Sequence, residues 1–424
     1  MVLKTWIVCI QYAANRLMEE RLWWVAKEIV LRMVSWLAWL CLVPLTLPFH
    51  LAGYRRLPVL TQHIGHLAAE LDCFFKLVRL NQIATQGKHY FILAPAHKVS
   101  NASLLDYWRD HITVITHPVA CRVLEIMTRG LLMRHEVKTY ILAIGRAARY
   151  FQVCAQWGYR PALLQLKLDH EARGNRFLAN LGLSEEDWFV CVHAREGGYS
   201  SWNESVHDYR NMTVEFLFPA MQEIIDRGGW CIRMGDESMK PLAPLRGVID
   251  YAHNKARSAE LDIFLCARCR FFLGNTSGLF LVSSIFGVPS ALTNQTPFAS
   301  TGFRQGDLSI PKHIRRLGHT KFLTSAQILD SPISNFRMSR FYLRAQLELV
   351  ENSAEEIKDM VFEMLETLEG RFREDPEVDL YRAQFSGRLR PEHYCYGTVG
   401  RISATFLLRH KEKFLEPTDQ IPAI

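Results

Sequence analysis

The sequence predicts an α/β protein with two Rossmann-like domains facing a cleft, and three observations support this prediction. Past Arg56, short apolar runs rich in β-branched and aromatic residues alternate with stretches of helical periodicity. That alternation is typical of parallel sheets joined by right-handed helical crossovers. The pattern occurs twice, and 424 residues are too many for one compact core.

We expect a membrane-associated helical segment over residues 1–55, one Rossmann-like domain over 56–185, a second over 186–345, and a helical tail over 346–424. Strands of the first domain are expected at 88–95, 111–116, 137–143 and 160–166. Strands of the second domain are expected at 189–193, 230–236, 247–253, 270–275 and 289–294.

The amino-terminal segment from Val34 to Tyr54 contains no Lys, Arg, Asp or Glu. About 20 residues of helix are enough to cross a bilayer core. Pro44 and Pro48 are expected to break this helix, and basic residues stand on both sides of it, which favours a helix dipping into one leaflet. Crossing and dipping both remain open. Either one predicts association with a membrane.

The net charge of +7 suits an anionic small ligand or an acidic membrane surface, and it is too diffuse to predict nucleic-acid binding. Cys266 and Cys269 form an isolated CxxC with no second pair near it, so we expect no zinc site there. The ten cysteines follow no repeating spacing and indicate reduced thiols.

The most informative stretch is "VCVHAREGGYSSWNESVHDYRN", from Val190 to Asn211. Its predicted strand ends in polar and charged residues followed by two glycines, namely His193, Arg195, Glu196, Gly197 and Gly198. In a doubly wound domain, ligands bind outside the carboxyl ends of the strands. A guanidinium supplies paired donors and a permanent charge, which is what a diphosphate needs.

The other strand ends of this half are polar or glycine as well, which indicates a binding site. They carry Gly235, Asp236, Asp250, Tyr251, Asn275, Thr276, Ser277 and Gly278. The "GNTSG" turn precedes a helix whose N-terminus would favour an anion, and it lacks the lysine of a P-loop. Arg210 is a second candidate phosphate contact, and Asn211 is expected to cap the following helix.

In the first half, Gly65 and His66 stand at the start of a predicted helix. A histidine near neutrality is suited to act as a general base or to hold a phosphate, and a packing role is equally open. Glu196 is the alternative base. Lys312, in the basic run "KHIRR", is a candidate for facing a membrane or an acceptor phosphate.

These motifs resemble those of GT-B-type glycosyltransferases. The HxR at a strand end resembles the motif of fucosyltransferases, in which the Arg contacts the sugar-nucleotide diphosphate. The "GNTSGLFLVSSIFGVPS" segment resembles the donor-domain turn of bacterial heptosyltransferases. As a whole, residues 56–352 resemble a family of bacterial surface-carbohydrate glycosyltransferases, although a single Arg followed by Glu196 departs from the fucosyltransferases.

The resemblance implies that residues 56–185 face the acceptor and residues 186–345 bind a nucleotide-sugar donor. It implies transfer to a carbohydrate or lipid-linked acceptor with no cofactor. Together with the apolar amino-terminal segment, it implies a location at the cytoplasmic face of the inner membrane. Because no DxD motif stands at a strand end, we expect arginine rather than a metal ion to neutralise the diphosphate. A UDP-sugar 2-epimerase, suggested by "HARE", and a non-catalytic nucleotide-sugar-binding subunit of a polysaccharide assembly complex remain alternatives.

Overall fold

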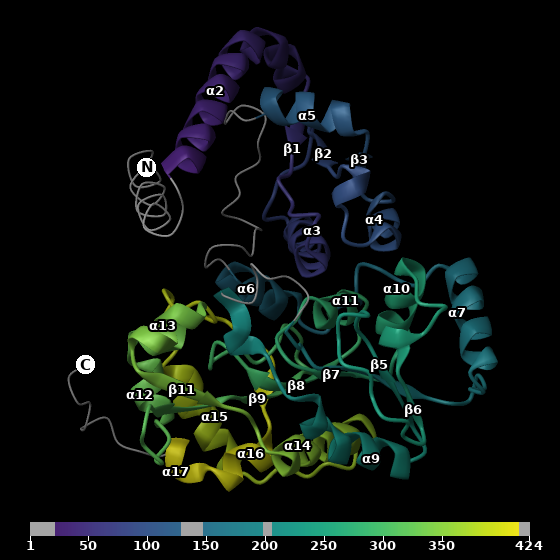
Figure 1. The fold of residues 1–424 in the computed structure, drawn as a ribbon, viewed down its shortest axis with the longest axis vertical. Helices are drawn as coiled ribbons and strands as arrows, with labels where there is room; N and C mark the ends of the chain where they lie inside the picture. The colour runs from purple at the N-terminus through teal and green to yellow at the C-terminus, as the bar shows by residue number, and fades with distance from the viewer. Residues whose placement is uncertain (1–21, 129–146, 198–205, 415–424) are drawn as a thin grey trace. The chain divides into compact units, whose positions relative to one another are not determined.

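A computed structural model describes residues 22–128, 147–197 and 206–414. The chain forms two compact units, each assembled from several stretches of sequence (Figure 1). Unit 1 comprises residues 1–58, 85–98 and 112–137, and unit 2 comprises residues 59–84, 99–111 and 138–424. Several helices that precede residue 186 therefore belong to the same unit as the carboxyl-terminal sheet. The expected cleft between two domains stays a prediction.

Unit 1 is built on a short parallel sheet with the strand order β1-β2-β3. Its elements are α2 (Leu22–Leu51), β1 (Tyr54–Arg56), β2 (His89–Leu93), β3 (Thr113–Ile115) and α5 (Pro118–Met127). Phe91, Leu93 and Cys121 form the centre of its core. The strands expected at 88–95 and 111–116 are confirmed, whereas the strand expected at 137–143 lies outside the described residues.

Helix α2 runs without interruption through Pro44 and Pro48, so the expected helix break is wrong. Each proline removes a backbone N–H from the helix, but α2 packs against α5 and β1. Such tertiary contacts stabilise a helix beyond its intrinsic propensity. Among the residues that the structure describes, no helix combines the length and the apolar character needed to cross a membrane.

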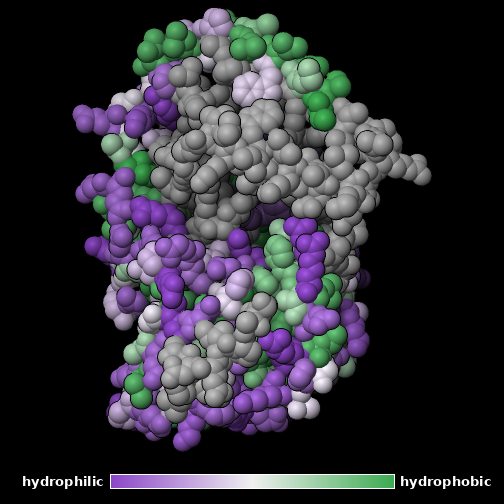
Figure 2. All heavy atoms as spheres, turned by 90° about the vertical axis from the view of Figure 1, so that its left-hand side faces the viewer, coloured by the Kyte–Doolittle hydropathy of each residue, from purple (hydrophilic) through white to green (hydrophobic). Residues whose placement is uncertain are grey.

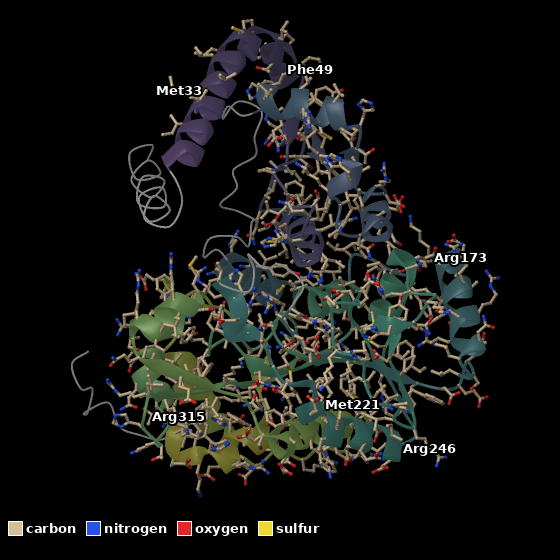
Figure 3. The ribbon with its side chains drawn as sticks, viewed as in Figure 1. Met33, Phe49, Arg173, Met221, Arg246 and Arg315 are labelled. Atoms are coloured by element: carbon tan, nitrogen blue, oxygen red, sulfur yellow. The ribbon has the colours of Figure 1, made fainter. Side chains whose placement is uncertain are left out.

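A large part of the surface of α2 is apolar and exposed. Figure 2 shows hydrophobic side chains gathered on the surface over this helix, and Figure 3 shows Met33 and Phe49 pointing away from it. The exposed apolar residues of α2 are Ile29, Val30, Met33, Val34, Trp36, Leu37, Leu40, Leu45, Leu47, Phe49 and Leu51. The prediction that α2 lies at a membrane surface therefore remains open to test.

Unit 2 is organised around a seven-stranded sheet in which every pairing is parallel. Its order is β12-β9-β8-β7-β4-β5-β6. The strands are β4 (Phe189–His193), β5 (Trp230–Arg233), β6 (Val248–Ile249), β7 (Phe272–Gly274), β8 (Ser290–Gln295), β9 (Leu308–Pro311) and β12 (Arg401–Ile402). The α/β class with parallel sheets is therefore confirmed.

Helices cover this sheet, and an antiparallel pair, β10 (His313–Arg316) with β11 (Leu347–Val350), stands beside it. The helices that precede β7 are α3 (Ile64–Arg79), α4 (Ala102–Trp108), α6 (Ala147–Trp157), α7 (Leu168–Asn180), α9 (Phe218–Asp226) and α10 (Ala259–Arg268). Those that follow it are α11 (Leu279–Ile285), α12 (Ser325–Leu329), α13 (Ser339–Arg344), α14 (Ala354–Leu368), α15 (Glu377–Gly387), α16 (Ala404–Arg409) and α17 (Lys411–Phe414).

One strand expected from the sequence is absent. Residues 160–166 form no strand, although Leu164 is buried. Instead, the indole N–H of Trp157 donates a hydrogen bond to the carbonyl oxygen of Pro161 at 3.1 Å. Apolar burial without a partner strand therefore accounts for the β-like pattern of this segment.

The strand order reverses at β4. The chain adds β5 and β6 on one side of β4 and then returns to add β7, β8 and β9 on the other side. In open parallel sheets, ligands bind in the crevice beyond the carboxyl ends of the two strands at such a switch point. A ligand site is therefore expected beyond the carboxyl ends of β4 and β7.

Candidate functional site

The ends of β4 and β7 are joined by the side chain of Asn275, which is fully buried. Its Oδ1 accepts a hydrogen bond from the backbone N–H of Arg195 at 2.9 Å, and its Nδ2 donates to the carbonyl oxygen of Arg210 at 2.6 Å. The backbone N–H of Met212 donates to the carbonyl oxygen of Arg195 at 3.0 Å. Three segments far apart in the sequence are thereby fixed at the switch point.

The Arg195 side chain lies along the segment from His207 to Asn211. Its Nη1 donates to the carbonyl oxygen of His207 at 3.3 Å and also to Oδ1 of Asn211. Lys312 approaches the same segment, and its Nζ donates to the carbonyl oxygen of Asn211 at 2.6 Å. The side chain of Asn211 therefore orients a guanidinium, and the helix-capping role expected from the sequence is wrong.

Three cations, Arg195, Arg210 and Lys312, lie in or against this segment, with Asp208 and Glu351 near Lys312. Burial, followed by the nearby charges of Arg210, Arg195 and His63, lowers the pKa of His207 to about 4. Burial and the neighbouring His66 likewise lower the pKa of His63. A protonated imidazole is unfavourable there chiefly because it is buried, and the nearby cations add to this effect. The same electrostatics favour a bound anion.

Several buried polar atoms around this site have no hydrogen-bond partner among the described residues. They are Nδ1 of His207, Nε of Arg210, Oγ of Ser277, Nε2 of Gln295 and Oγ1 of Thr296. Two of these residues, Gln295 and Thr296, lie against the "GNTSG" turn. The hydroxyl of Thr276 is within donating distance of Oε1 of Gln295, at 3.3 Å, and of the carbonyl oxygen of Thr296, at 3.2 Å. Buried polar groups normally have partners, so this concentration indicates a polar ligand.

Helix α3 meets the turn after β7 through a pair of glycines. A Cβ added to Gly65 would lie 2.9 Å from the Cα of Gly278, and a Cβ added to Gly278 would lie 2.8 Å from Cγ2 of Ile64. Real Cβ atoms do not approach other heavy atoms this closely, so both positions require glycine. The contact places the amino-terminal turn of α3 directly against Gly278, at the end of the "GNTSG" turn.

His66 follows this contact and forms a pair with Glu70 one helical turn later. The two side chains meet between His66 Nδ1 and Glu70 Oε1 at 2.8 Å, and Glu70 is fully buried. The other oxygen of Glu70 accepts a hydrogen bond from the backbone N–H of Leu60 at 3.1 Å. Because the carboxylate accepts the proton of Nδ1, the lone pair of His66 is on Nε2.

Two predicted site residues are instead held in an ion-pair network. The fully buried Arg233 lies 3.0 Å from Oε1 of Glu196 and 3.1 Å from Oδ1 of Asp250. The second oxygen of Glu196 accepts from the backbone N–H of Lys240, and that of Asp250 accepts from Leu242, both at 3.0 Å. These contacts satisfy the charge of a buried guanidinium, and they leave His66 as the candidate base.

His193 and Tyr251 are both buried and bonded to the backbone. The Nδ1–H of His193 donates to the carbonyl oxygen of Met234 at 3.0 Å, and burial lowers its pKa to about 4. The hydroxyl of Tyr251 donates to the carbonyl oxygen of Ser258 at 3.3 Å and accepts from its N–H at 3.1 Å. Both side chains therefore shape the loops beside the sheet.

The remaining predicted positions are in loops. Gly235 has a φ of 153°, and a Cβ there would lie 2.2 Å from the sulfur of Met239. Oδ1 of Asp236 accepts from the backbone N–H of Ser238 at 2.9 Å, which stabilises a turn. Gly197 is exposed, whereas Gly198 lies outside the described residues.

Sequence reasoning did not find several residues of this site. Glu70 carries a usable signal, because it stands four residues after His66 on one helix face. Lys312 was noticed only as part of a basic run. His63 and His207 stand in the same short motifs as His66 and Arg210, whereas Gln295 and Thr296 come to the site through long-range packing, which a single sequence does not record.

Comparisons with known proteins give only distant likenesses. No family model matches this chain, and neither does any curated protein. Among solved structures, a glycosyl transferase family 9 protein of Veillonella parvula is 14% identical, with 57% of this chain and 80% of that chain covered, at a TM-score of 0.35. The ADP-heptose LPS heptosyltransferase II of E. coli is 12% identical, with coverages of 56% and 84%, at a TM-score of 0.36.

A third solved structure is TibC, described as a bacterial iron-containing dodecameric glycosyltransferase from enterotoxigenic E. coli. It is 12% identical, with 57% of this chain and 58% of that chain covered, at a TM-score of 0.34. TM-scores this low do not assign an activity.

The buried imidazole of His193 predicts a pH dependence of stability. In the unfolded chain this imidazole binds a proton near pH 6.5, but in the folded protein only near pH 4. Its depressed pKa therefore contributes stability that is fully present above pH 6.5 and is lost as the pH falls toward 4, by about 3 kcal/mol in total. Urea unfolding at intervals from pH 7.5 to 4.5 measures this loss.

The control is His193→Gln, which keeps an N–H for the carbonyl oxygen of Met234 but does not titrate. We expect the variant to lose clearly less stability than the wild type over this pH range. Parallel curves for the two proteins would contradict the assignment.

Proposed function

We propose that this protein is a glycosyltransferase that moves a sugar from a nucleotide-sugar donor to a surface-polysaccharide or lipid-linked acceptor. The observation that carries the proposal is the gathering of cations and unpartnered polar atoms at the switch point of the parallel sheet. A ligand for this place must be anionic and must accept several hydrogen bonds. The diphosphate of a nucleotide-sugar meets both requirements.

Arg195 and Arg210 are the proposed diphosphate contacts. Arg195 is oriented by its bonds to the 207–211 segment, and Nε of Arg210 is buried without a partner. The hydroxyl of Ser277 and the backbone of Thr276 to Gly278 would supply further donors. Helix α11 has only seven residues, so its dipole adds little, and the arginines must supply most of the charge.

Transfer breaks the bond between the anomeric carbon of the sugar and the diphosphate oxygen. The leaving diphosphate takes the electron pair, so negative charge grows on the oxygen that departs. Fixed guanidinium groups stabilise that charge most effectively when they need no reorganisation during the reaction. In this proposal Arg195 and Arg210 do this work in place of a metal ion.

His66 is the proposed general base. Its Nε2 takes the hydroxyl proton of the acceptor as the hydroxyl oxygen bonds to the anomeric carbon. Glu70 holds the Nδ1–H at 2.8 Å, keeps the lone pair on Nε2, and stabilises the imidazolium that forms. The glycine contact between Gly65 and Gly278 fixes this histidine at the same turn that would bind the donor.

Removing the guanidinium of Arg195 should weaken donor binding. We expect Arg195→Ala to reduce the affinity for the preferred nucleotide-sugar about 10–100-fold, since a charge-assisted hydrogen bond contributes about 1.5–3 kcal/mol. Arg195→Lys should retain part of the affinity, because it keeps the charge but loses the paired donors. A thermal-shift screen of UDP-, GDP-, CMP- and ADP-sugars, followed by calorimetry, measures the effect.

The matched control is Arg246→Ala, because Arg246 is exposed and precedes the amino end of β6, at the edge of the parallel sheet opposite the carboxyl end of β4. This variant should bind as the wild type does. If no nucleotide-sugar stabilises the wild-type protein, or if Arg195→Ala binds equally well, the proposed donor site is wrong.

Removing the proposed base should slow transfer without weakening donor binding. We expect His66→Gln to reduce turnover about 10²–10⁴-fold, the usual contribution of a general base. The assay follows release of nucleoside diphosphate in the presence of a lipid-linked oligosaccharide fraction, with His97→Gln, an exposed histidine, as the control. Release that does not depend on acceptor would instead favour the epimerase alternative, and donor binding without any release would favour a binding subunit.

We propose that the exposed apolar face of α2 places the enzyme on the membrane where a lipid-linked acceptor is found. We expect the protein to float with phosphatidylglycerol vesicles in a density gradient, and Leu37→Glu with Leu40→Glu to abolish flotation. Leu343→Glu is the control, because that leucine is 74% exposed but stands in unit 2. Equal flotation of all variants would refute the role of α2.

A further inference from the structure

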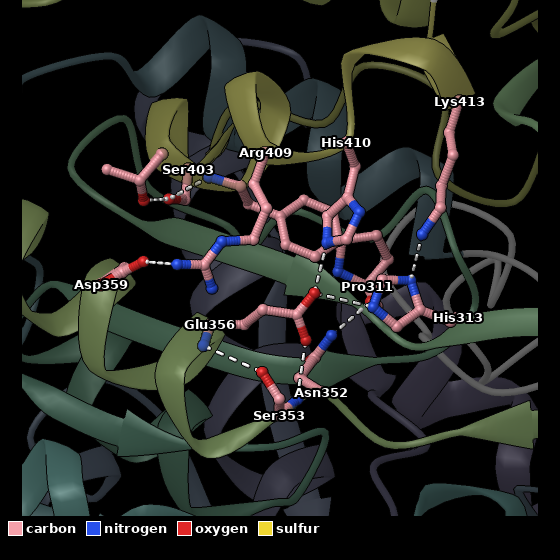
Figure 4. Close-up of polar contacts among 12 residues, drawn as sticks. Pro311, His313, Asn352, Ser353, Glu356, Asp359, Ser403, Arg409, His410 and Lys413 are labelled. Atoms are coloured by element: carbon pink, nitrogen blue, oxygen red, sulfur yellow. Dashed lines mark hydrogen bonds and ion pairs between the residues drawn. The ribbon is translucent and has the colours of Figure 1, made fainter.

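Outside the site described above, three elements distant in the sequence bring together two imidazoles and a carboxylate (Figure 4). His313 stands on β10, Glu356 on α14, and His410 directly after α16. Nε2 of His313 lies 2.9 Å from Oε1 of Glu356, and Nε2 of His410 contacts the same oxygen. We call these three residues the His–Glu–His cluster.

Neighbouring side chains hold the members of this cluster in place. The imidazole of His313 stacks against the ring of Phe322 at 4.6 Å and that of Phe406 at 5.5 Å between centroids. The second carboxylate oxygen of Glu356 accepts from the backbone N–H of Ser353 at 2.7 Å, within the capping box of α14. Oε1 therefore points toward the histidines with its orientation already fixed.

We propose that the His–Glu–His cluster binds a divalent transition-metal ion of the zinc class. Imidazole nitrogen and carboxylate oxygen are ligands that zinc accepts, at about 2.0–2.2 Å. The three ligand atoms lie within 4.8 Å of one another. Two atoms about 2 Å from one ion stand at most about 4 Å apart, so small side-chain rotations bring the three into range.

The environment leaves an approach to the cluster. The side chain of His410 is 16% exposed, compared with 7% for His313 and 5% for Glu356. An ion can therefore enter from the His410 side, where water would complete its coordination. Bound there, it would fasten α16 to β10 and α14, and it would fix the backbone one residue from Lys312, which contacts the candidate donor site.

Lys413 opposes this binding. Its Nζ lies 3.1 Å from Nδ1 of His313 and 4.3 Å from the centroid of Phe322. A metal on Nε2 of His313 moves the imidazole proton to Nδ1, where the ammonium now donates. Lys413 must then move away from Nδ1, and its positive charge, so close to the site, repels the ion. Replacing it with methionine should therefore strengthen binding.

The test uses the full-length, tag-free protein after dialysis against a chelator. Calorimetric titration with ZnCl₂ should give one bound ion per chain, and CoCl₂ should give a visible d–d absorption band. His410→Gln should weaken zinc binding by at least about 10–100-fold. Even the loss of a group that only hydrogen-bonds to a metal ligand lowers metal affinity by that factor. His319→Gln, which removes an exposed histidine, should bind as the wild type does.

Lys413→Met is the second variant, and it should bind zinc more tightly than the wild type. Circular dichroism establishes that each variant is folded, and His410→Gln is preferred to a Glu356 variant because His410 is the least buried of the three. Absence of zinc binding in the wild type, or equal binding by His410→Gln, would show that the cluster is a hydrogen-bond network alone.

Discussion

The geometry of the candidate site depends on one buried amide, the side chain of Asn275. It accepts from the backbone of Arg195 and donates to the backbone of Arg210, so it fixes two arginine-bearing segments to the end of β7. An amide presents an acceptor oxygen and a donor nitrogen side by side, so one side chain holds both segments. Asn275 directly follows β7, which pairs with β4 at the point where the strand order reverses. Its side chain therefore lies where ligands bind in open parallel sheets.

This arrangement brings cations together at a cost in free energy. Arg195 and Lys312 contact the segment from His207 to Asn211, which itself contains Arg210, and burial together with the two arginines keeps His207 unprotonated. Like charges at such distances repel, and the buried donors that lack partners add to the cost. A bound diphosphate would relieve both, and this is why an anionic ligand explains the site better than a purely structural role.

The sequence predicted much of the scaffold and the residues nearest the strand ends. The parallel sheet of unit 2 and Arg195 follow from local patterns, because strand periodicity and glycine-rich turns are written in contiguous residues. Side-chain contacts between residues far apart in the sequence do not follow from such local patterns. The sequence offers Glu196 as an alternative base, but its carboxylate is paired with the buried Arg233, which stands 37 positions away in the chain.

Two further differences have the same origin. Residues 160–166 have the composition of a strand, but they pair with no neighbouring strand. Their apolar pattern therefore reflects burial and not sheet formation. Pro44 and Pro48 predict the end of a helix, but α2 continues through both of them, and its packing against α5 stabilises it there. The pairing of His66 with Glu70 was readable from their spacing on one helix, whereas the approach of Gly65 to Gly278 required the structure.

The most direct test of the account is a crystal structure of the protein with a bound nucleoside diphosphate. The account predicts density for the diphosphate between the guanidinium groups of Arg195 and Arg210 and the turn from Thr276 to Gly278, with His66 facing the place of the transferred sugar. A diphosphate bound elsewhere, or none at saturating concentration, would contradict the assignment of this site and of the transferase activity built on it.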